Sequence, residues 1–165
     1  MEITLPKPSK TANRQQRKAK RPQCGGGSSA SSQSVQVRNP LSHTICVVDD
    51  DLAARSGMCN LIEAWGYHAL FFDAGESFLA SPQINEIDFA IFDIKLRGMD
   101  GFAVQQQCSL LGLELPVIFI SGHGDVDLER RAVAAGALAL LPKPVDPELL
   151  RVYIEDRLGR QGGRS

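Results

Sequence analysis

Polar residues stand directly after four short apolar runs of this chain, and their types suit phosphoryl transfer. An aspartate triplet at 49–51 follows the run TICVV, and Asp93 follows FAIF. Ser121 ends the run VIFIS, and Lys143 comes shortly after ALALL. Carboxylates, a hydroxyl and an ammonium group can together bind a divalent cation and the oxygens of a phosphoryl group. This chemistry requires a fold that brings the four positions together.

Five short apolar runs are the candidate strands. Most of them are apolar throughout, as expected of parallel strands that are covered on both faces. They comprise residues 44–48, 67–72, 87–92, 117–120 and 137–141.

The segments between these runs have helical patterns. Apolar residues recur at helical spacing before Gly66, at positions 58, 61, 62 and 65. Residues 102–111 and 125–135 predict two further helices, and 75–80 a short one. Asp146-Pro147-Glu148 predicts the start of a last helix, because it combines a capping acid, a proline at the first helical position and a second acid.

The alternation of strands and helices predicts an α/β fold, a doubly wound (βα)5 parallel sheet. Such sheets bind ligands beyond the carboxyl ends of their strands. If the first and third strands are neighbours, their ends lie ~5 Å apart, and Asp49 and Asp50 converge on Asp93. Two carboxylates at ~4 Å repel by ~4 kcal/mol at an effective dielectric constant of 20. The cluster therefore needs shifted pKa values or a cation, and its all-oxygen donors suit Mg²⁺.

Each of these features alone has an ordinary structural explanation. An aspartate triplet after a strand is commonly a turn or a helix cap, and Asp100-Gly101 predicts a turn. Ser121-Gly122 and Lys143-Pro144 are common loop sequences. Four polar features at four expected strand ends, in this order, are much harder to assign to chance.

Charge divides the chain into a basic tail and an acidic domain. Residues 1–41 hold eight Lys/Arg against one acid, a net of +7, and the remainder holds ten basic and eighteen acidic groups, a net of −8. The first 41 residues are rich in Pro, Gly, Ser, Gln and Lys, which predicts a disordered tail before a domain over 42–159, with a second tail at 160–165.

No apolar run approaches the ~20 residues of a membrane span. The four cysteines lack CxxC spacing, and we expect a reduced, cytoplasmic protein.

Four segments together resemble the receiver domain of bacterial two-component response regulators, the family of the chemotaxis response regulator. The resemblance covers roughly residues 43–158, and the combined motifs are highly specific. The segments are ICVVDDD (45–51), FAIFDIKLRGMDGF (89–102), VIFISGHGD (117–125) and LLPKPVD (140–146). The resemblance implies a flavodoxin-like strand order 2-1-3-4-5.

The resemblance also implies a role for each polar residue. Asp93 would accept a phosphoryl group from a phosphohistidine on a sensor histidine kinase or phosphotransfer protein. Asp49, Asp50 and Asp93 would hold Mg²⁺ together with the backbone carbonyl of Lys95. The Ser121 hydroxyl would move to the phosphoryl group and Lys143 would pair with it. The resemblance further implies a cis Lys143–Pro144 bond.

This chain departs from the family pattern in two places. Leu140 stands where receivers commonly carry an aromatic residue that turns inward with the serine or threonine, so this switch position is altered. Arg97 stands where proline is usual. We expect an exposed loop arginine there; the alternative is a cation that alters kinase docking or phosphoryl lifetime. His123 lies where family members tune hydrolysis, and a plain loop position is expected.

Two other functions remain open. A phosphatase or mutase with an aspartyl nucleophile also uses Asp, Lys, Ser/Thr and Mg²⁺, but such enzymes carry a second acid where this chain has Lys95. A pseudo-receiver or binding module would never be phosphorylated. We expect a signalling switch rather than an enzyme, with an unknown downstream protein target and phosphorylation-linked homodimerisation as an open point. We expect no DNA-binding domain, and three readings stay open: a stand-alone receiver, a fragment whose linker begins at Arg160, or a regulator that acts through protein contacts.

Overall fold

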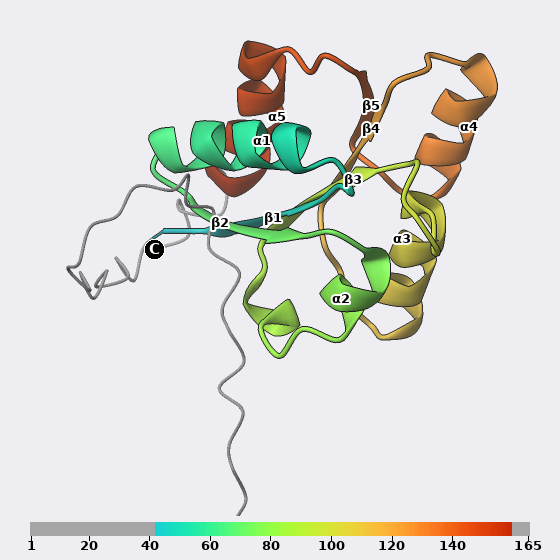
Figure 1. Cartoon of the computed structure of the whole chain (residues 1–165), viewed down its shortest axis with the longest axis horizontal. Coiled ribbons are helices and arrows are strands. Elements are labelled where there is room, and N and C mark those ends of the chain that lie inside the picture. Colours follow the sequence, from blue (N-terminus) through green and yellow to red (C-terminus); the bar gives the residue numbers. More distant parts are fainter. Residues whose placement is uncertain (1–41, 160–165) are drawn as a thin grey trace, which may run out of the picture.

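A computed structural model describes residues 42–159 of the chain. The predicted tails at 1–41 and 160–165 lie outside the described residues. Five parallel strands form one sheet in the order β2-β1-β3-β4-β5, which confirms the predicted fold and strand order (Figure 1). The strands are β1 (Thr44–Val48), β2 (His68–Phe72), β3 (Phe89–Asp93), β4 (Val117–Ser121) and β5 (Ala139–Pro142).

Helices cover both faces of this sheet, as the apolar strands require. One core cluster joins the strands to α1 (Leu52–Ala64) and α5 (Pro147–Gly159). A second joins them to α2 (Gly75–Leu79), α3 (Gly101–Leu110) and α4 (Val126–Ala134). The two sets of helices lie on opposite sides of the sheet (Figure 1). β1, β3 and β4 are buried along their whole length, so polar side chains can reach water only beyond the strand ends.

Aspartate side chains begin the helices that follow the strands. Asp51 accepts hydrogen bonds from the backbone N–H groups of Ala53 and Ala54, at 2.8 and 3.1 Å. Asp146 caps α5 in the same way, as predicted, by accepting from the N–H groups of Glu148 and Leu149. These caps satisfy helix N–H groups that have no partner within the helix. They also fix the direction in which the chain leaves each strand.

Two details of the fold differ from the sequence-based expectations. A 3-10 helix, Ile84–Glu86, lies before β3 where no element was expected. Asp100-Gly101 forms a helix start rather than a plain turn, because Asp100 accepts from the N–H of Ala103 at 2.8 Å and Gly101 is the first residue of α3.

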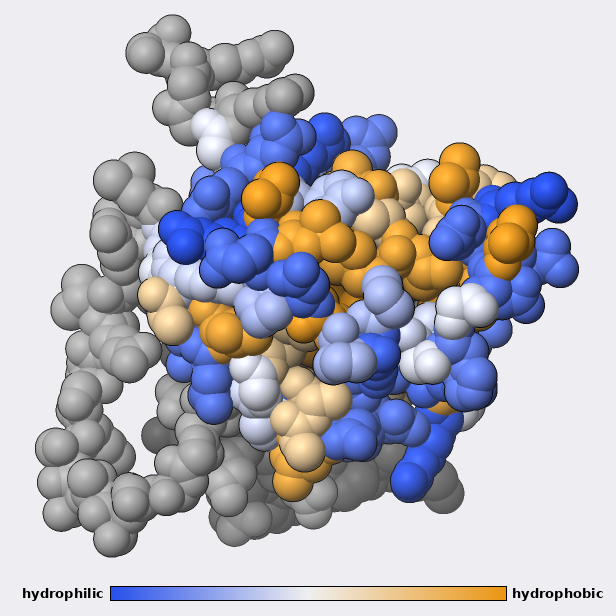
Figure 2. Space-filling view, turned by 90° about the horizontal axis from the view of Figure 1, so that it is seen from above, coloured by the Kyte–Doolittle hydropathy of each residue, from blue (hydrophilic) through white to orange (hydrophobic). Residues whose placement is uncertain are grey.

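The surface carries several exposed apolar side chains. Figure 2 shows hydrophobic residues among hydrophilic ones on the face seen from above. No helix in the described part of the chain is long and apolar enough to cross a membrane. The large exposed apolar residues are Leu52, Leu110, Leu111, Val126, Val133, Leu138, Leu149 and Val152.

Candidate functional site

Three carboxylates meet where β1 and β3 end. The two strands pair in register, with Val48 opposite Phe92, so the residues that follow them lie side by side. Carboxylate oxygens of Asp49, Asp50 and Asp93 lie within 4.8 Å of one another. All the donors are hard oxygen atoms, and this donor set fits Mg²⁺. The predicted convergence of these three acids is confirmed.

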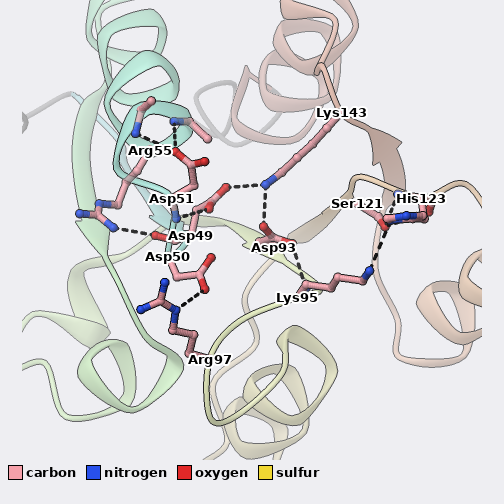
Figure 3. Close-up of polar contacts among 12 residues, drawn as sticks. Asp49, Asp50, Asp51, Arg55, Asp93, Lys95, Arg97, Ser121, His123 and Lys143 are labelled. Atoms are coloured by element: carbon pink, nitrogen blue, oxygen red, sulfur yellow. Dashed lines mark hydrogen bonds and ion pairs between the residues drawn. The ribbon is translucent and has the colours of Figure 1, made fainter.

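Lys143 reaches this cluster from the end of β5. Its Nζ donates to Oδ2 of Asp93 at 2.6 Å and to Oδ2 of Asp49 at 2.9 Å (Figure 3). The Lys143–Pro144 bond that follows is cis, as the resemblance implied. Asp49 and Asp93 are both buried, so the ammonium group offsets two charges that would otherwise stand in a poorly hydrated place.

The protonation of Asp93 and Lys143 reflects this enclosure. Burial raises the pKa of the Asp93 carboxyl, although hydrogen bonds from Lys143 and from the Lys95 N–H oppose the rise. Burial alone would lower the pKa of Lys143, but the hydrogen bonds and charges of Asp93 and Asp49 outweigh it and raise that pKa. The site therefore favours the charged form of Lys143 and disfavours the charged form of Asp93.

Backbone contacts hold the carboxylates in place. Oδ1 of Asp49 accepts from the N–H of Asp51, and Oδ1 of Asp93 accepts from the N–H of Lys95, both at 2.9 Å. Arg55, buried on α1, donates from Nη1 to the backbone oxygen of Asp49 at 2.7 Å. Its guanidinium also lies 5.2 Å from the centre of the Phe71 ring. Arg55 thus holds the backbone at the start of the loop after β1.

Ser121 lies at the end of β4, but its hydroxyl does not join the carboxylates. The hydroxyl donates to the backbone oxygen of His123 at 2.8 Å and accepts from the His123 N–H at 3.2 Å. Nδ1 of His123 lies 3.4 Å from Nζ of Lys95 (Figure 3). The expectation that His123 is a plain loop residue therefore misses its contact with the residue two positions after Asp93.

Arg97 lies on the opposite side of the cluster, in the loop after β3. Its side chain is 91% exposed, as expected of a loop arginine, yet its Nε lies 3.5 Å from Oδ2 of Asp50. Asp50 keeps 25% of its side chain exposed. The solvent-facing carboxylate of the cluster thus has its own cation.

Leu140, the altered switch position, lies on β5 and faces the groove beside α4. It is half-buried, pairs in register with Phe119 and packs in the core cluster that includes α4. It also lines a groove of about 240 Å³ with Val133, Leu138 and Tyr153. An aliphatic side chain therefore occupies the place where the family commonly has an aromatic ring.

The sequence patterns do not predict the contacts of Arg55, His123 and Arg97. A signal for Arg55 exists in hindsight, because a cation in the first turns of a helix opposes the helix dipole and so needs another partner. The contacts of His123 and Arg97 depend on loop conformation, and no periodic pattern in the sequence reports that conformation.

Comparison with known proteins decides the family. The Response regulator receiver domain family matches residues 45–155. The chain belongs to this family. It is a two-component receiver domain, a signalling module, and its acidic pocket of Asp49, Asp50 and Asp93 is typical of the family's Mg²⁺ site.

Individual relatives agree with this assignment. Nodulation protein W of Bradyrhizobium diazoefficiens is 32% identical over 126 residues, which cover 73% of this chain and 56% of that protein. The solved response regulator StyR is 34% identical with a TM-score of 0.66, covering 72% of this chain and 60% of that one. A CheY-like receiver domain protein from Methanospirillum hungatei is 30% identical with a TM-score of 0.66. The match covers 73% of this chain and 97% of that one. This chain spans about half the length of the curated relatives it matches.

Proposed function

We propose that this receiver accepts a phosphoryl group on Asp93 from a sensor histidine kinase or a phosphotransfer protein, and thereby switches a protein-binding surface. The observation that carries the proposal is the contact of Asp93 with Lys143 at 2.6 Å inside a cluster of three carboxylates. This arrangement combines a buried oxygen nucleophile, a fixed cation and a set of donors for a metal ion.

The proposed transfer is an in-line displacement. A carboxylate oxygen of ionised Asp93 attacks the phosphorus atom, an O–P bond forms, and the N–P bond to the donor histidine breaks. Asp49, Asp50, Asp93 and the Lys95 carbonyl would hold Mg²⁺, which when bound neutralises charge on the phosphoryl oxygens. The hydrogen bond from Lys143 favours the ionised form of Asp93 and orients its carboxylate before transfer. Hydrolysis of the acyl phosphate later returns the carboxylate.

The switch that follows involves Ser121. Its hydroxyl now bonds to the backbone of His123, and a rotation would let it donate to a phosphoryl oxygen instead. Lys143 would bind another of these oxygens. With Leu140 in the usual aromatic position, the signal would pass mainly through the β4–α4 loop rather than through a rotating ring, and would shift the population of a partner-binding state.

The output is proposed to be a protein contact. Five exposed apolar residues lie on α4, on α5 and just before β5, which supports a partner surface or a phosphorylation-linked homodimer there. A cytoplasmic location stays a prediction. These residues are Val126, Val133, Leu138, Leu149 and Val152.

Two alternatives have less support. An aspartyl phosphatase would need an acid two residues after the nucleophile, where Lys95 stands and contacts His123. A pseudo-receiver would not require Asp49, Asp50, Asp93, Ser121 and Lys143 all to be retained.

A direct test incubates the protein with Mg²⁺ and acetyl phosphate and measures intact mass. We expect the mass of one added phosphoryl group in the wild type and none in Asp93→Asn. Asp127→Asn, which changes an exposed aspartate on α4, is the matched control and should be labelled like the wild type. No added mass in the wild type, or equal labelling of Asp93→Asn, would overturn the proposal. Size-exclusion chromatography of the same samples reports homodimerisation.

A further inference from the structure

The three carboxylates of the cluster differ in how their charge is balanced. Asp49 and Asp93 are buried, and each has one oxygen on Lys143 and the other on a backbone N–H. Asp50 is more exposed, and the cation placed on it is Arg97. Figure 3 shows the Arg97 guanidinium beside the Asp50 carboxylate, on the side away from Lys143.

The side chains of the pocket carry a nearly balanced charge. Three carboxylates face two cations, Lys143 and Arg97, so a net charge of −1 remains when all are ionised. Lys143 is the more tightly held of the two, with contacts of 2.9 and 2.6 Å, whereas Arg97 stands at 3.5 Å on an exposed side chain. Arg97 is thus the cation that can leave without exposing a buried charge.

A divalent cation at this pocket must compete with Arg97. A metal ligand oxygen lies about 2.1 Å from Mg²⁺, so an Asp50 oxygen that coordinates the ion loses much of its attraction for a guanidinium. A guanidinium that stays within a few ångström of the ion also repels it. Both effects weaken metal binding as long as Arg97 occupies its present position.

We propose that Arg97 competes with Mg²⁺ for Asp50. When no metal ion is bound, its guanidinium pairs with the Asp50 carboxylate, and this pairing lowers the affinity of the three-carboxylate site for Mg²⁺. The inference rests on the proposed function, in which Asp49, Asp50 and Asp93 hold the metal. In this proposal Arg97 does not coordinate the ion. It touches a metal ligand and leaves that ligand when the ion binds.

The test measures Mg²⁺ dissociation constants by isothermal titration calorimetry at fixed ionic strength, without any phosphoryl donor. Arg97→Gln removes the charge and should tighten Mg²⁺ binding about threefold to tenfold. Arg97→Lys keeps the charge and should stay within about twofold of the wild type. Because the side chain is 91% exposed, both variants are expected to fold.

Two comparisons separate a local effect from a general change in charge. Arg130→Gln removes a similarly exposed arginine that pairs with Asp127 on α4, and it should leave the Mg²⁺ dissociation constant unchanged. In an Asp50→Asn background, Arg97→Gln should tighten binding by less than about half of its effect in the wild type, because the shared carboxylate is gone.

The outcomes are distinct. If the wild type and Arg97→Gln bind Mg²⁺ equally well, the competition is absent and the inference is wrong while the metal site stands. The inference is also wrong if Arg130→Gln tightens Mg²⁺ binding as much as Arg97→Gln does, because the effect would then be a general change in charge. If neither the wild type nor any variant binds Mg²⁺, the metal site of the proposed function fails, and the inference fails with it.

Discussion

The carboxyl group of the acceptor, Asp93, is buried and largely shielded from solvent. The residue is 5% exposed, and burial raises the pKa of its carboxyl despite the hydrogen bond from Lys143. Burial disfavours the ionised form of this nucleophile, and a metal ion or an esterified phosphoryl group would relieve that cost. Ionisation of Asp93 should therefore lower the stability of the domain when no metal ion is bound.

We expect Asp93→Asn to raise the melting temperature at pH 7 in the presence of a chelator. A carboxyl whose pKa is raised by folding binds its proton more tightly in the folded state, so its ionisation costs stability as the pH rises from its unfolded value of 3.8 through its folded value. The advantage of the Asp93→Asn variant should therefore shrink as the pH falls toward that unfolded value. Thermal unfolding between about pH 4 and pH 7 checks the trend.

Asp127→Asn is the control for this experiment, because the Asp127 side chain is 81% exposed. It should leave the melting temperature within about 2 °C at every pH. If Asp93→Asn is less stable than the wild type at pH 7, the loss of the contact with Lys143 costs more free energy than the removal of the buried negative charge gains.

The sequence predicts which residues of the site come together, but not the directions of all their side chains. The convergence of Asp49, Asp50 and Asp93 follows from strand ends that meet at one edge of a parallel sheet. The present direction of the Ser121 hydroxyl does not, because a serine side chain rotates among staggered positions of similar energy. The contact of Arg97 with Asp50 escapes prediction for the same reason, since a long exposed side chain has many rotamers.

At the scale of the elements, the start of α3 lies directly against the backbone of the acceptor. Gly101 packs against the backbone of Asp93, and a Cβ built there would lie 2.5 Å from the Asp93 carbonyl oxygen. Its N–H donates to the oxygen of Ile94 at 3.1 Å. The residue pair Asp100-Gly101 therefore does more than turn the chain: Asp100 caps the helix and Gly101 lets it approach the strand end.

Gly101→Ala should lower the free energy of unfolding by about 1–3 kcal/mol, because the rigid backbone of Asp93 and Ile94 cannot yield easily to an added methyl group. It should also slow phosphorylation by acetyl phosphate, since any relief of the clash shifts Asp93. Denaturant unfolding and intact-mass time courses measure the two effects.

Gly57→Ala is the matched control on α1. Gly57 is an exposed helical glycine with nothing within 4 Å of an added Cβ. Alanine has the higher helix propensity, so this variant should raise the free energy of unfolding by about 0.5–1 kcal/mol and leave phosphorylation unchanged. Equal effects of the two substitutions would contradict the close approach at Gly101.

Strands and helices were predictable because their patterns are strong. Each predicted strand lies within two residues of the observed one, and Gly66 ends its helix with a φ of +90°, which glycine adopts without strain. The 3-10 helix at Ile84–Glu86 was not predictable, since its three residues are too few to show a period.

On the scale of the whole molecule, the site exists only in the folded chain. Asp93 lies 44 positions from Asp49 and 50 from Lys143, and the sheet order β2-β1-β3-β4-β5 brings their three strand ends to one edge. A metal ion held by these ends would bind the unfolded chain far more weakly. Metal binding and folding should then be linked.

We therefore expect Mg²⁺ to stabilise the whole domain. A ligand that binds only the folded state at about one hundred times its dissociation constant adds about 2.7 kcal/mol to the free energy of unfolding. For a domain of this size, the melting temperature should rise on the order of 10 °C. Asp50→Asn, which removes one ligand, should lose most of this shift, and NaCl at equal ionic strength should not reproduce it. An equal rise in Asp50→Asn would mean that Mg²⁺ acts elsewhere on this acidic domain rather than at the strand ends.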